Sequence, residues 1–207
     1  MYVNKKTEAS QRTRAALEAA GRELFETRGF ADVGAEEVVA LAGVTRGALY
    51  HHYDGKEGLF AAVAEGAMQR LHAEIAQAAT SEVTPRGALH RGVTRFLELA
   101  SEPALQRLLF VDAPTVLGWP AWRGLDDRYG LGLLKQGMRL ALAGLPALQA
   151  DVSAHLLLGA LIEAAMWIAH AEAKADARCQ AEAGLRRLLD GLLAASADNP
   201  AFSPGEP

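Results

Sequence analysis

The side chains best suited to specific contacts with another molecule lie within the segment TRGALYHHYDGK, residues 45–56. Arg46 can donate two parallel hydrogen bonds, which matches the exposed edge of a guanine base. Gly47 would let the backbone approach a nucleic acid closely, and Tyr50 adds a hydroxyl group. Thr45 is a good N-cap and could also contact a phosphate. These residue types at this spacing indicate contacts with DNA.

The same segment continues into a candidate phosphate contact. Lys56 begins a new helix, so its charge and the helix N-terminus could address one phosphate together. His51 and His52 offer imidazole donors, but neighbouring residues on a helix point about 100° apart and do not converge on one metal ion. The candidate DNA-contacting residues are Arg14, Gly34, Ala35, Thr45, Arg46, Gly47, Ala48, Tyr50, His51, His52 and Lys56.

Two short helices must position these side chains. The pattern predicts one helix at about residues 35–42, a turn at Gly43, and a second helix from Thr45 through His52. This arrangement is a helix-turn-helix, whose second helix enters the DNA major groove. The apolar positions expected to pack the two helices together are Val38, Leu41, Ala42, Val44 and Leu49.

At this point the sequence resembles a known family. The run GVTRGALYHHYDGKEGLF and the first helix ending in TRGF resemble TetR-type (TetR/AcrR) regulators over about Arg12 to Phe60. Beyond Phe60 only the architecture is similar, with the last two helices pairing across a dimer. The resemblance implies a cytoplasmic bacterial homodimer, usually a repressor, that leaves a palindromic DNA operator when a small-molecule effector binds.

The sequence departs from the family pattern in two respects. Val33 and Gly34 stand just before the helix expected at residues 35–42, where the family usually has Ser or Thr. Backbone N–H groups of Ala35 and Glu36 would therefore replace a side-chain phosphate contact. Tyr53 replaces the usual Phe at the end of the helix that begins at Thr45, where it should pack similarly.

Helical periodicity continues to the end of the chain, and strand signals are nearly absent, so the fold class is all-α. We expect a DNA-binding domain over residues 1–55, a helical ligand-sensing and dimerisation domain over 56–197, and a disordered tail over 198–207. The further helices are expected at about 8–28, from 56 onward, 85–100, 103–112 (ending before Pro114), 119–143, 147–173 and 176–197.

The helical body should contain a ligand cavity, for which we expect large apolar side chains and one carboxylate to face inward. These candidate pocket residues are Phe96, Phe110, Trp122, Glu163, Met166 and Trp167. Separately hydrogen-bonded polar groups, or aromatic residues that only fill space, would explain the same pattern. The last helix carries an apolar stripe expected to form core or dimer interface, with Leu185, Leu188 and Leu192 as the interface candidates.

The composition excludes several other classes of protein. No glycine-rich phosphate loop or nucleophile elbow occurs, so we expect no enzyme, no metal and no cofactor. Cys179 is the single cysteine, which fits a reducing cytoplasm. The apolar stretch 152–171 is interrupted by two histidines and a glutamate, which favours a buried helix over a membrane span.

Two alternatives to a ligand-responsive regulator remain. The net charge of −4 gives no basic field, and Gly34 replaces a polar contact. Both observations suit a helical ligand-binding or interaction protein without specific DNA binding. A constitutive architectural DNA binder would instead lack a sensor cavity and show poor sequence preference.

Overall fold

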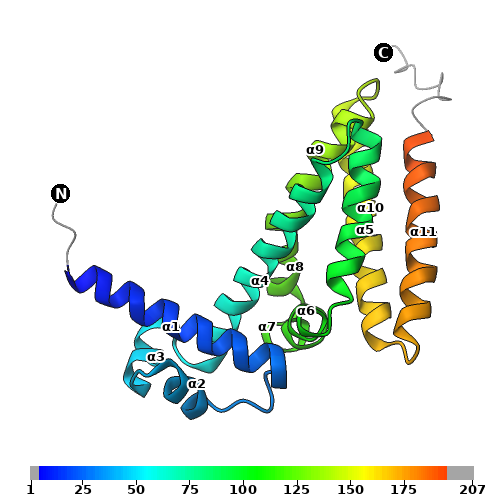
Figure 1. Ribbon diagram of the computed structural model, residues 1–207. Helices are drawn as coiled ribbons and strands as arrows, with labels where there is room; N and C mark the ends of the chain where they lie inside the picture. Colours follow the sequence, from blue (N-terminus) through cyan, green and yellow to red (C-terminus); the bar gives the residue numbers. More distant parts are fainter. Residues whose placement is uncertain (1–4, 195–207) are drawn as a thin grey trace. The chain divides into compact units, whose positions relative to one another are not determined.

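A computed structural model describes residues 5–194 of the chain, and every regular element within that range is helical. Its first three helices are α1 (Lys5–Arg28), α2 (Ala35–Ala42) and α3 (Arg46–Tyr53). The long helix α4 (Lys56–Ala79) follows, and then α5 (Pro85–Ala100). Figure 1 shows the order of these helices along the chain. The all-α fold class is thus confirmed.

The chain forms two compact units. One contains the chain up to Arg70 together with Glu102–Leu125, and the other contains Leu71–Ser101 with the chain from Asp126 onward. We call them the DNA-binding unit, after the helix-turn-helix expected within it, and the helical body. This division differs from the single boundary expected at residue 55, because α4 contributes to both units and the chain later returns to the DNA-binding unit.

The core of the DNA-binding unit is built from aromatic side chains far apart in sequence. The ring centroids of Phe25, Phe30 and Phe60 lie 5.0–5.9 Å from one another. Leu17, Val38 and Leu49 are fully buried around them. This packing fixes α1, α2 and the start of α4, and so determines where α3 lies. Leu41, which we expected to pack, is 49% exposed because it lies on the outer side of α2.

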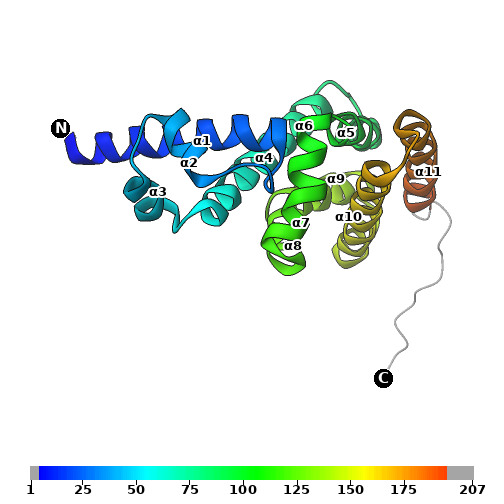
Figure 2. The ribbon, with the colours of Figure 1, turned by 90° about the horizontal axis from the view of Figure 1, so that it is seen from below.

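The returning segment 102–125 consists of short helical pieces, α6 (Pro103–Leu105), the π-helical η1 (Gln106–Asp112), α7 (Ala113–Leu117) and α8 (Trp119–Asp126). Figure 2 shows α6, α7 and α8 in succession. Asp112 accepts a hydrogen bond of 2.8 Å from the Phe30 N–H, and Arg107 donates one of 2.9 Å to the Thr27 carbonyl oxygen. The segment therefore holds the loop that connects α1 to α2.

Two predicted boundaries in this region were wrong. The chain stays helical through Pro114, because proline at the second position of α7 needs no N–H donor there. The single helix expected over 119–143 is divided into α8, the π-helical η2 (Asp127–Leu131) and α9 (Gly132–Ala141). Gly130, within η2, has room only for a hydrogen, because a Cβ atom there would lie 2.8 Å from the His72 ring.

The helical body is completed by α10 (Ala147–His170) and α11 (Lys174–Ala194). Helix α10 packs against α9, α11 and α5, and Figures 1 and 2 show α5, α10 and α11 side by side. Fully buried residues such as Ala154, Leu157 and Leu189 form the core. The other predicted helices agree with the structure within a few residues, and the predicted tail lies outside the described residues.

Helix α10 is long and apolar enough to cross a membrane by length and composition. It is the one such helix among residues 5–194, and 39% of its apolar window is buried within the chain. A single helix of this kind is weak evidence for a span, since core helices of globular proteins have the same composition.

Candidate DNA-binding surface and ligand cavity

Helix α3 has a buried side and an exposed polar side. Leu49 and Tyr53 are buried, whereas Thr45, Arg46 and Tyr50 are exposed. The Thr45 hydroxyl accepts a hydrogen bond of 3.3 Å from the Ala48 N–H, which confirms the predicted N-cap. Gly43, in the turn before α3, has φ +65°, a left-handed conformation that glycine adopts without strain. The turn and the cap together fix the direction of α3.

The other candidate contacts on this helix differ in accessibility. Gly47 and His51 are exposed, while Ala48 and His52 are half-buried. A Cβ atom at Gly47 would meet only the Thr45 hydroxyl, at 3.8 Å, so the surface beside Gly47 is open to a partner.

Arg46 is held by two neighbouring side chains. Its guanidinium donates to Glu36 at 2.6 Å and to the Tyr50 hydroxyl at 3.4 Å, and it lies 5.5 Å from the centre of the Tyr50 ring. The hydrogen bond to Tyr50 and the charge of Glu36 raise the pKa of Arg46. All three side chains are exposed, so Arg46 is fully charged and can exchange the Glu36 carboxylate for another acceptor.

The start of α2 uses glycine where the family usually has a hydroxyl residue. Gly34 is the N-cap, and its N–H donates to the Glu37 carboxylate at 3.0 Å. Glu37 also pairs with Arg28, and these two contacts lower the pKa of Glu37. Gly34 is exposed and Ala35 half-buried. The first backbone N–H groups of α2 therefore stand at the surface without a capping side chain.

Lys56 lies in a different environment from the one expected of a phosphate contact. Its ammonium donates to the carbonyl oxygens of Phe30 at 3.0 Å and Val33 at 2.9 Å, and it lies 3.8 Å from the centre of the Phe30 ring. These contacts tie the start of α4 to the α1–α2 loop. In this structure Lys56 is thus a structural side chain, and two of the three N–H donors of its ammonium are taken by these carbonyl oxygens.

Tyr53 connects α3 to α1. Its hydroxyl donates to the Glu18 carboxylate at 2.6 Å, and burial followed by this bond raises the pKa of Tyr53 above its usual range. Arg14 is exposed, donates to Glu18 at 3.1 Å and lies 5.5 Å from the centre of the Tyr53 ring. The tyrosine keeps the packing role of phenylalanine and adds a polar link that phenylalanine lacks.

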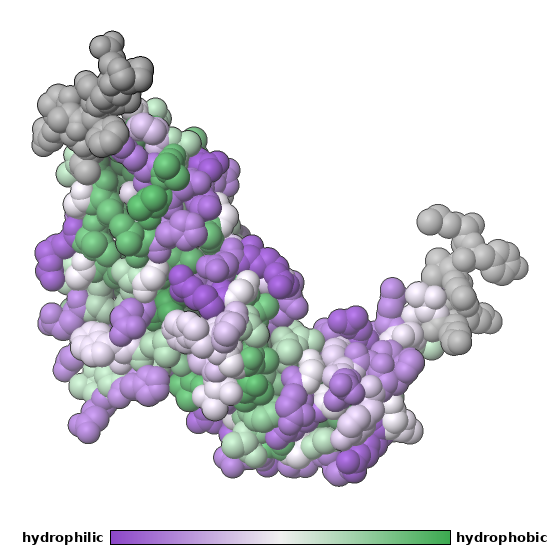
Figure 3. Space-filling view, turned by 180° about the vertical axis from the view of Figure 1, so that it is seen from behind, coloured by the Kyte–Doolittle hydropathy of each residue, from purple (hydrophilic) through white to green (hydrophobic). Residues whose placement is uncertain are grey.

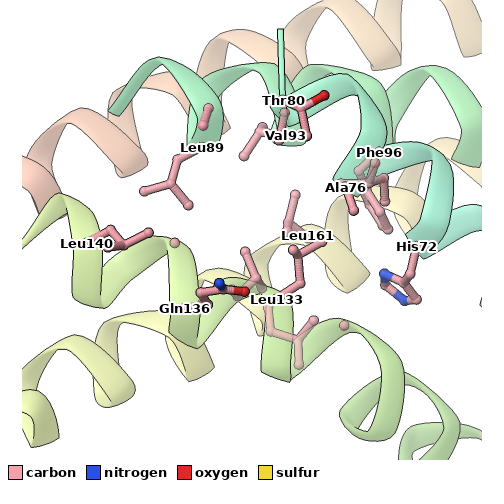
Figure 4. Close-up of a pocket in the computed structure, with 18 residues that line it drawn as sticks. His72, Ala76, Thr80, Leu89, Val93, Phe96, Leu133, Gln136, Leu140 and Leu161 are labelled. Carbon is pink, nitrogen blue, oxygen red and sulfur yellow. The ribbon is translucent and has the colours of Figure 1, made fainter. Parts of the chain in front are cut away.

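A cavity of about 400 Å³ lies within the helical body. Its lining comes from the second half of α4, from α5, from η2 with α9, and from α10. Figure 4 shows the side chains that surround it. The lining is apolar apart from three polar side chains, those of His72, Thr80 and Gln136. A volume of this size, enclosed mainly by hydrocarbon, is typical of small-molecule sites.

His72 is the polar lining residue with the least exposure to solvent. Its side chain is 11% exposed, and its Nε2 atom lies 3.7 Å from the Asp126 carboxylate, whose side chain is 4% exposed. The Nε2 atom is buried and has no hydrogen-bond partner within the described part of the chain. A buried nitrogen in this state costs free energy unless a ligand or water satisfies it.

The predicted pocket residues are dispersed through the structure. Phe96 lines the cavity. Phe110 and Trp122 belong to the DNA-binding unit, where Trp122 is fully buried and donates a hydrogen bond of 2.7 Å to Leu109. Glu163 and Trp167 were expected to face inward, but they are exposed because they lie on the opposite side of α10 from the core. Met166 is half-buried outside the cavity.

Sequence reasoning missed most of the cavity lining. Small lining residues such as Ala76 and Gly92 leave room for the cavity. Hydrophobic periodicity alone does not distinguish such residues from those of a tightly packed core. His72 gave a detectable signal, since a lone histidine stands in the apolar stripe of α4 between Leu71 and Ile75.

The apolar stripe of α11 is mainly core. Leu185 is 5% exposed and Leu189 fully buried, so Leu185 is not accessible to a partner in this structure. Leu188 is 41% exposed and Leu192 is half-buried. These differences follow from the helical period, because Leu185 and Leu189 share the face that packs inside the body, whereas Leu188 lies beside it.

Two stretches of the chain match known protein families. Residues 17–63 match "Bacterial regulatory proteins, tetR family", and residues 86–192 match "Tetracyclin repressor-like, C-terminal domain". The HTH-type transcriptional regulator TtgR of Pseudomonas putida is 33% identical over 109 residues, which cover 51% of each chain. The matched stretch thus spans about half the length of this curated relative.

Solved structures extend the similarity over nearly the whole chain. A TetR-family regulator from Pectobacterium atrosepticum is 33% identical with a TM-score of 0.77, covering 89% of this chain and 96% of that one. A TetR-family regulator from Streptomyces coelicolor, 17% identical, has the same fold with a TM-score of 0.68, covering 91% and 97% of the two chains. Together with the exposed, capped α3 of a helix-turn-helix, these matches show that the chain belongs to the TetR family of bacterial transcriptional regulators.

Proposed function

We propose that this regulator is a cytoplasmic repressor that binds a palindromic operator as a homodimer and is released from DNA by a small apolar molecule. The observation that carries the proposal is the exposed side of α3. It places Thr45, Arg46 and Tyr50 together on a helix whose opposite side is locked into the core.

Arg46 is the side chain best placed to distinguish bases. Its guanidinium is charged, exposed and already paired with an acceptor, Glu36, that a guanine edge could replace. The open surface at Gly47 and the uncapped N–H groups at the start of α2 supply backbone contacts to phosphates. Because each chain carries one such unit, two α3 helices must meet half-sites about 34–36 Å apart, or at a related spacing.

The proposed dimer uses the exposed side of α10. Leu148 is 75% exposed, Val152 50% and Leu156 60%, and their spacing of four residues places them on one face. Figure 3, which shows the side of the body carrying α10, has a continuous hydrophobic area there. A second copy of the chain would cover this face, and Leu188 on α11 is a further candidate contact. An apolar area of this kind is costly to leave in water.

Release from DNA requires that the ligand bind the conformation of the regulator that cannot hold DNA better than the one that can. The cavity is suited to this task because α4 supplies part of its lining and also belongs, by its first residues, to the DNA-binding unit. A ligand that favours one position of α4 would therefore alter the spacing of the two α3 helices in the dimer.

The DNA-binding proposal is tested with Arg46→Ala, measured by fluorescence anisotropy on the upstream DNA of the protein's own gene and on a scrambled duplex. We expect the ratio of the two affinities to fall by roughly 5- to 150-fold, the loss of one bidentate base contact. Arg91→Ala is the matched control, since Arg91 lies on α5 in the helical body. A wild-type protein that binds both duplexes equally would refute sequence-specific regulation.

The dimer is tested with Leu156→Glu in light scattering. A charge within the proposed interface would be buried without a partner, so we expect monomers and loss of operator binding. Val83→Glu is the control, because Val83 is 98% exposed in the loop before α5. A Leu156→Glu protein that remains dimeric would exclude this face, and Leu188→Glu would then test α11.

A further inference from the structure

The polar groups of the cavity are unevenly distributed. Figure 4 shows His72 at one end, with Leu89 and Leu140 at the other. Gln136 is exposed, and the Thr80 hydroxyl already donates a hydrogen bond of 2.7 Å to the Gln77 carbonyl oxygen. His72 is thus the buried polar group that a ligand inside the cavity would meet.

The position of the His72 ring is fixed by its surroundings. Asp126 lies beside Nε2 at 3.7 Å, a separation too long for a hydrogen bond. Gly130 provides the space for the ring, because a Cβ atom there would come within 2.8 Å of Cε1. The ring is thus held at the cavity wall, and its Nε2 atom is buried without a hydrogen-bond partner in the described part of the chain.

The lining also limits the charge and size of the ligand. Among the described residues that line the cavity, none is Lys, Arg, Asp or Glu. An ionic group would therefore be desolvated without a counter-charge, which is costly. The volume of about 400 Å³ lies within the range of small-molecule sites. The cavity therefore suits a small neutral molecule.

We propose that the effector is a neutral, mainly apolar molecule with one hydroxyl group, and that His72 is the residue that hydrogen-bonds this hydroxyl. A hydroxyl both donates and accepts, so it can bond an imidazole nitrogen in either tautomer of the ring. The inference rests on the proposed role of the cavity as effector site. It adds the chemical class of the ligand and the residue that selects it.

Three probes of similar shape test the ligand class, namely 4-phenylphenol, biphenyl and biphenyl-4-carboxylate. Equilibrium dialysis against the full-length protein measures all three, and it is preferable to tryptophan fluorescence because no tryptophan lines the cavity. We expect 4-phenylphenol to bind about three- to tenfold more tightly than biphenyl, as one net hydrogen bond predicts. The carboxylate should bind at least tenfold more weakly than 4-phenylphenol. Equal binding of all three probes would overturn the proposal.

Variants of His72 assign the selection to that residue. In His72→Leu, 4-phenylphenol and biphenyl should bind equally, with biphenyl binding unchanged within about twofold. His72→Gln, which keeps a donor and an acceptor, should restore part of the preference. The control is His90→Leu, since His90 lies on α5, pairs with Asp190 at 3.0 Å and does not line the cavity. A His72→Leu protein that still prefers 4-phenylphenol would overturn the assignment.

A second variant covers the case in which His72→Leu does not fold. The double substitution His72→Leu/Asp126→Asn also removes the buried carboxylate charge, and circular dichroism checks that it folds. If this double variant still prefers 4-phenylphenol to biphenyl, the assignment of the hydroxyl contact to His72 is overturned. The operator-release assay separates this inference from the proposed function. If 4-phenylphenol binds through His72 without releasing DNA, the ligand site stands and the effector role fails.

Discussion

Lys56 offers the sharpest test of how the DNA-binding unit is held together. We expect Lys56→Met to destabilise this unit and to weaken DNA binding only through that loss of structure. Methionine keeps a long apolar side chain, so the substitution removes the charge and its two hydrogen bonds to Phe30 and Val33 while retaining most of the packing.

The expected magnitude follows from these contacts. Hydrogen bonds from a charged donor contribute about 1.5–3 kcal/mol each, and the contact with the Phe30 ring adds about 0.5–1 kcal/mol. Lys56 is half-buried, so solvent reduces these values. We therefore expect Lys56→Met to lower the free energy of unfolding by about 2 kcal/mol. Lys135→Met is the control, because Lys135 makes a single contact of 3.7 Å with Asp151, and its loss should cost less than about 0.5 kcal/mol.

The assay is urea unfolding followed by tryptophan fluorescence in a Trp167→Phe background. The remaining Trp119 and Trp122 both lie in the DNA-binding unit, so the signal reports that unit. The salt dependence of operator binding gives a second readout, since loss of a phosphate contact lowers the slope of log affinity against log salt by about 1. We expect an unchanged slope. An unchanged unfolding midpoint with a slope reduced by about 1 would refute the structural role and make Lys56 a phosphate contact.

Three further predictions concern the same unit. Asp112→Ala should lower the free energy of unfolding by about 1–3 kcal/mol in the urea assay, because it leaves the Phe30 N–H without its acceptor; no change would mean that η1 does not hold the α1–α2 loop. Gly34→Ser should add a hydroxyl cap at the start of α2 and raise operator affinity in anisotropy titrations severalfold, since φ −87° and ψ 150° suit serine; unchanged affinity would show that this position does not face phosphate. Tyr53 should ionise last among the tyrosines in an alkaline titration at 295 nm, because burial and Glu18 raise its pKa. Its stabilising contribution is present below the pKa of an unfolded tyrosine and is lost as pH rises through the folded value, so a Tyr53→Phe protein should lack both the late absorbance step and this alkaline loss.

The local elements of this protein follow from local sequence. The caps at Thr45 and Thr84, the glycine turn at Gly43 and the apolar period of α10 predicted helix positions within a few residues. Hydrogen bonds that begin and end helices involve residues three or four positions apart, so a short stretch of sequence contains the information. The helix-turn-helix was predictable for the same reason, whereas the family followed from a resemblance over residues 12–60.

Tertiary structure decided the rest. The return of residues 102–125 to the DNA-binding unit rests on Asp112 and Phe30, which are 82 positions apart in sequence. Whether Lys56 contacts a phosphate or the Phe30 carbonyl depends on the course of a distant loop. Likewise, periodicity placed Glu163 on a helix but did not say which face of α10 would be buried. His72 becomes a ligand-binding candidate only because Gly130 and Asp126 lie beside its ring in the folded chain. Such properties depend on packing between elements remote in sequence, and no local pattern encodes which of them will meet.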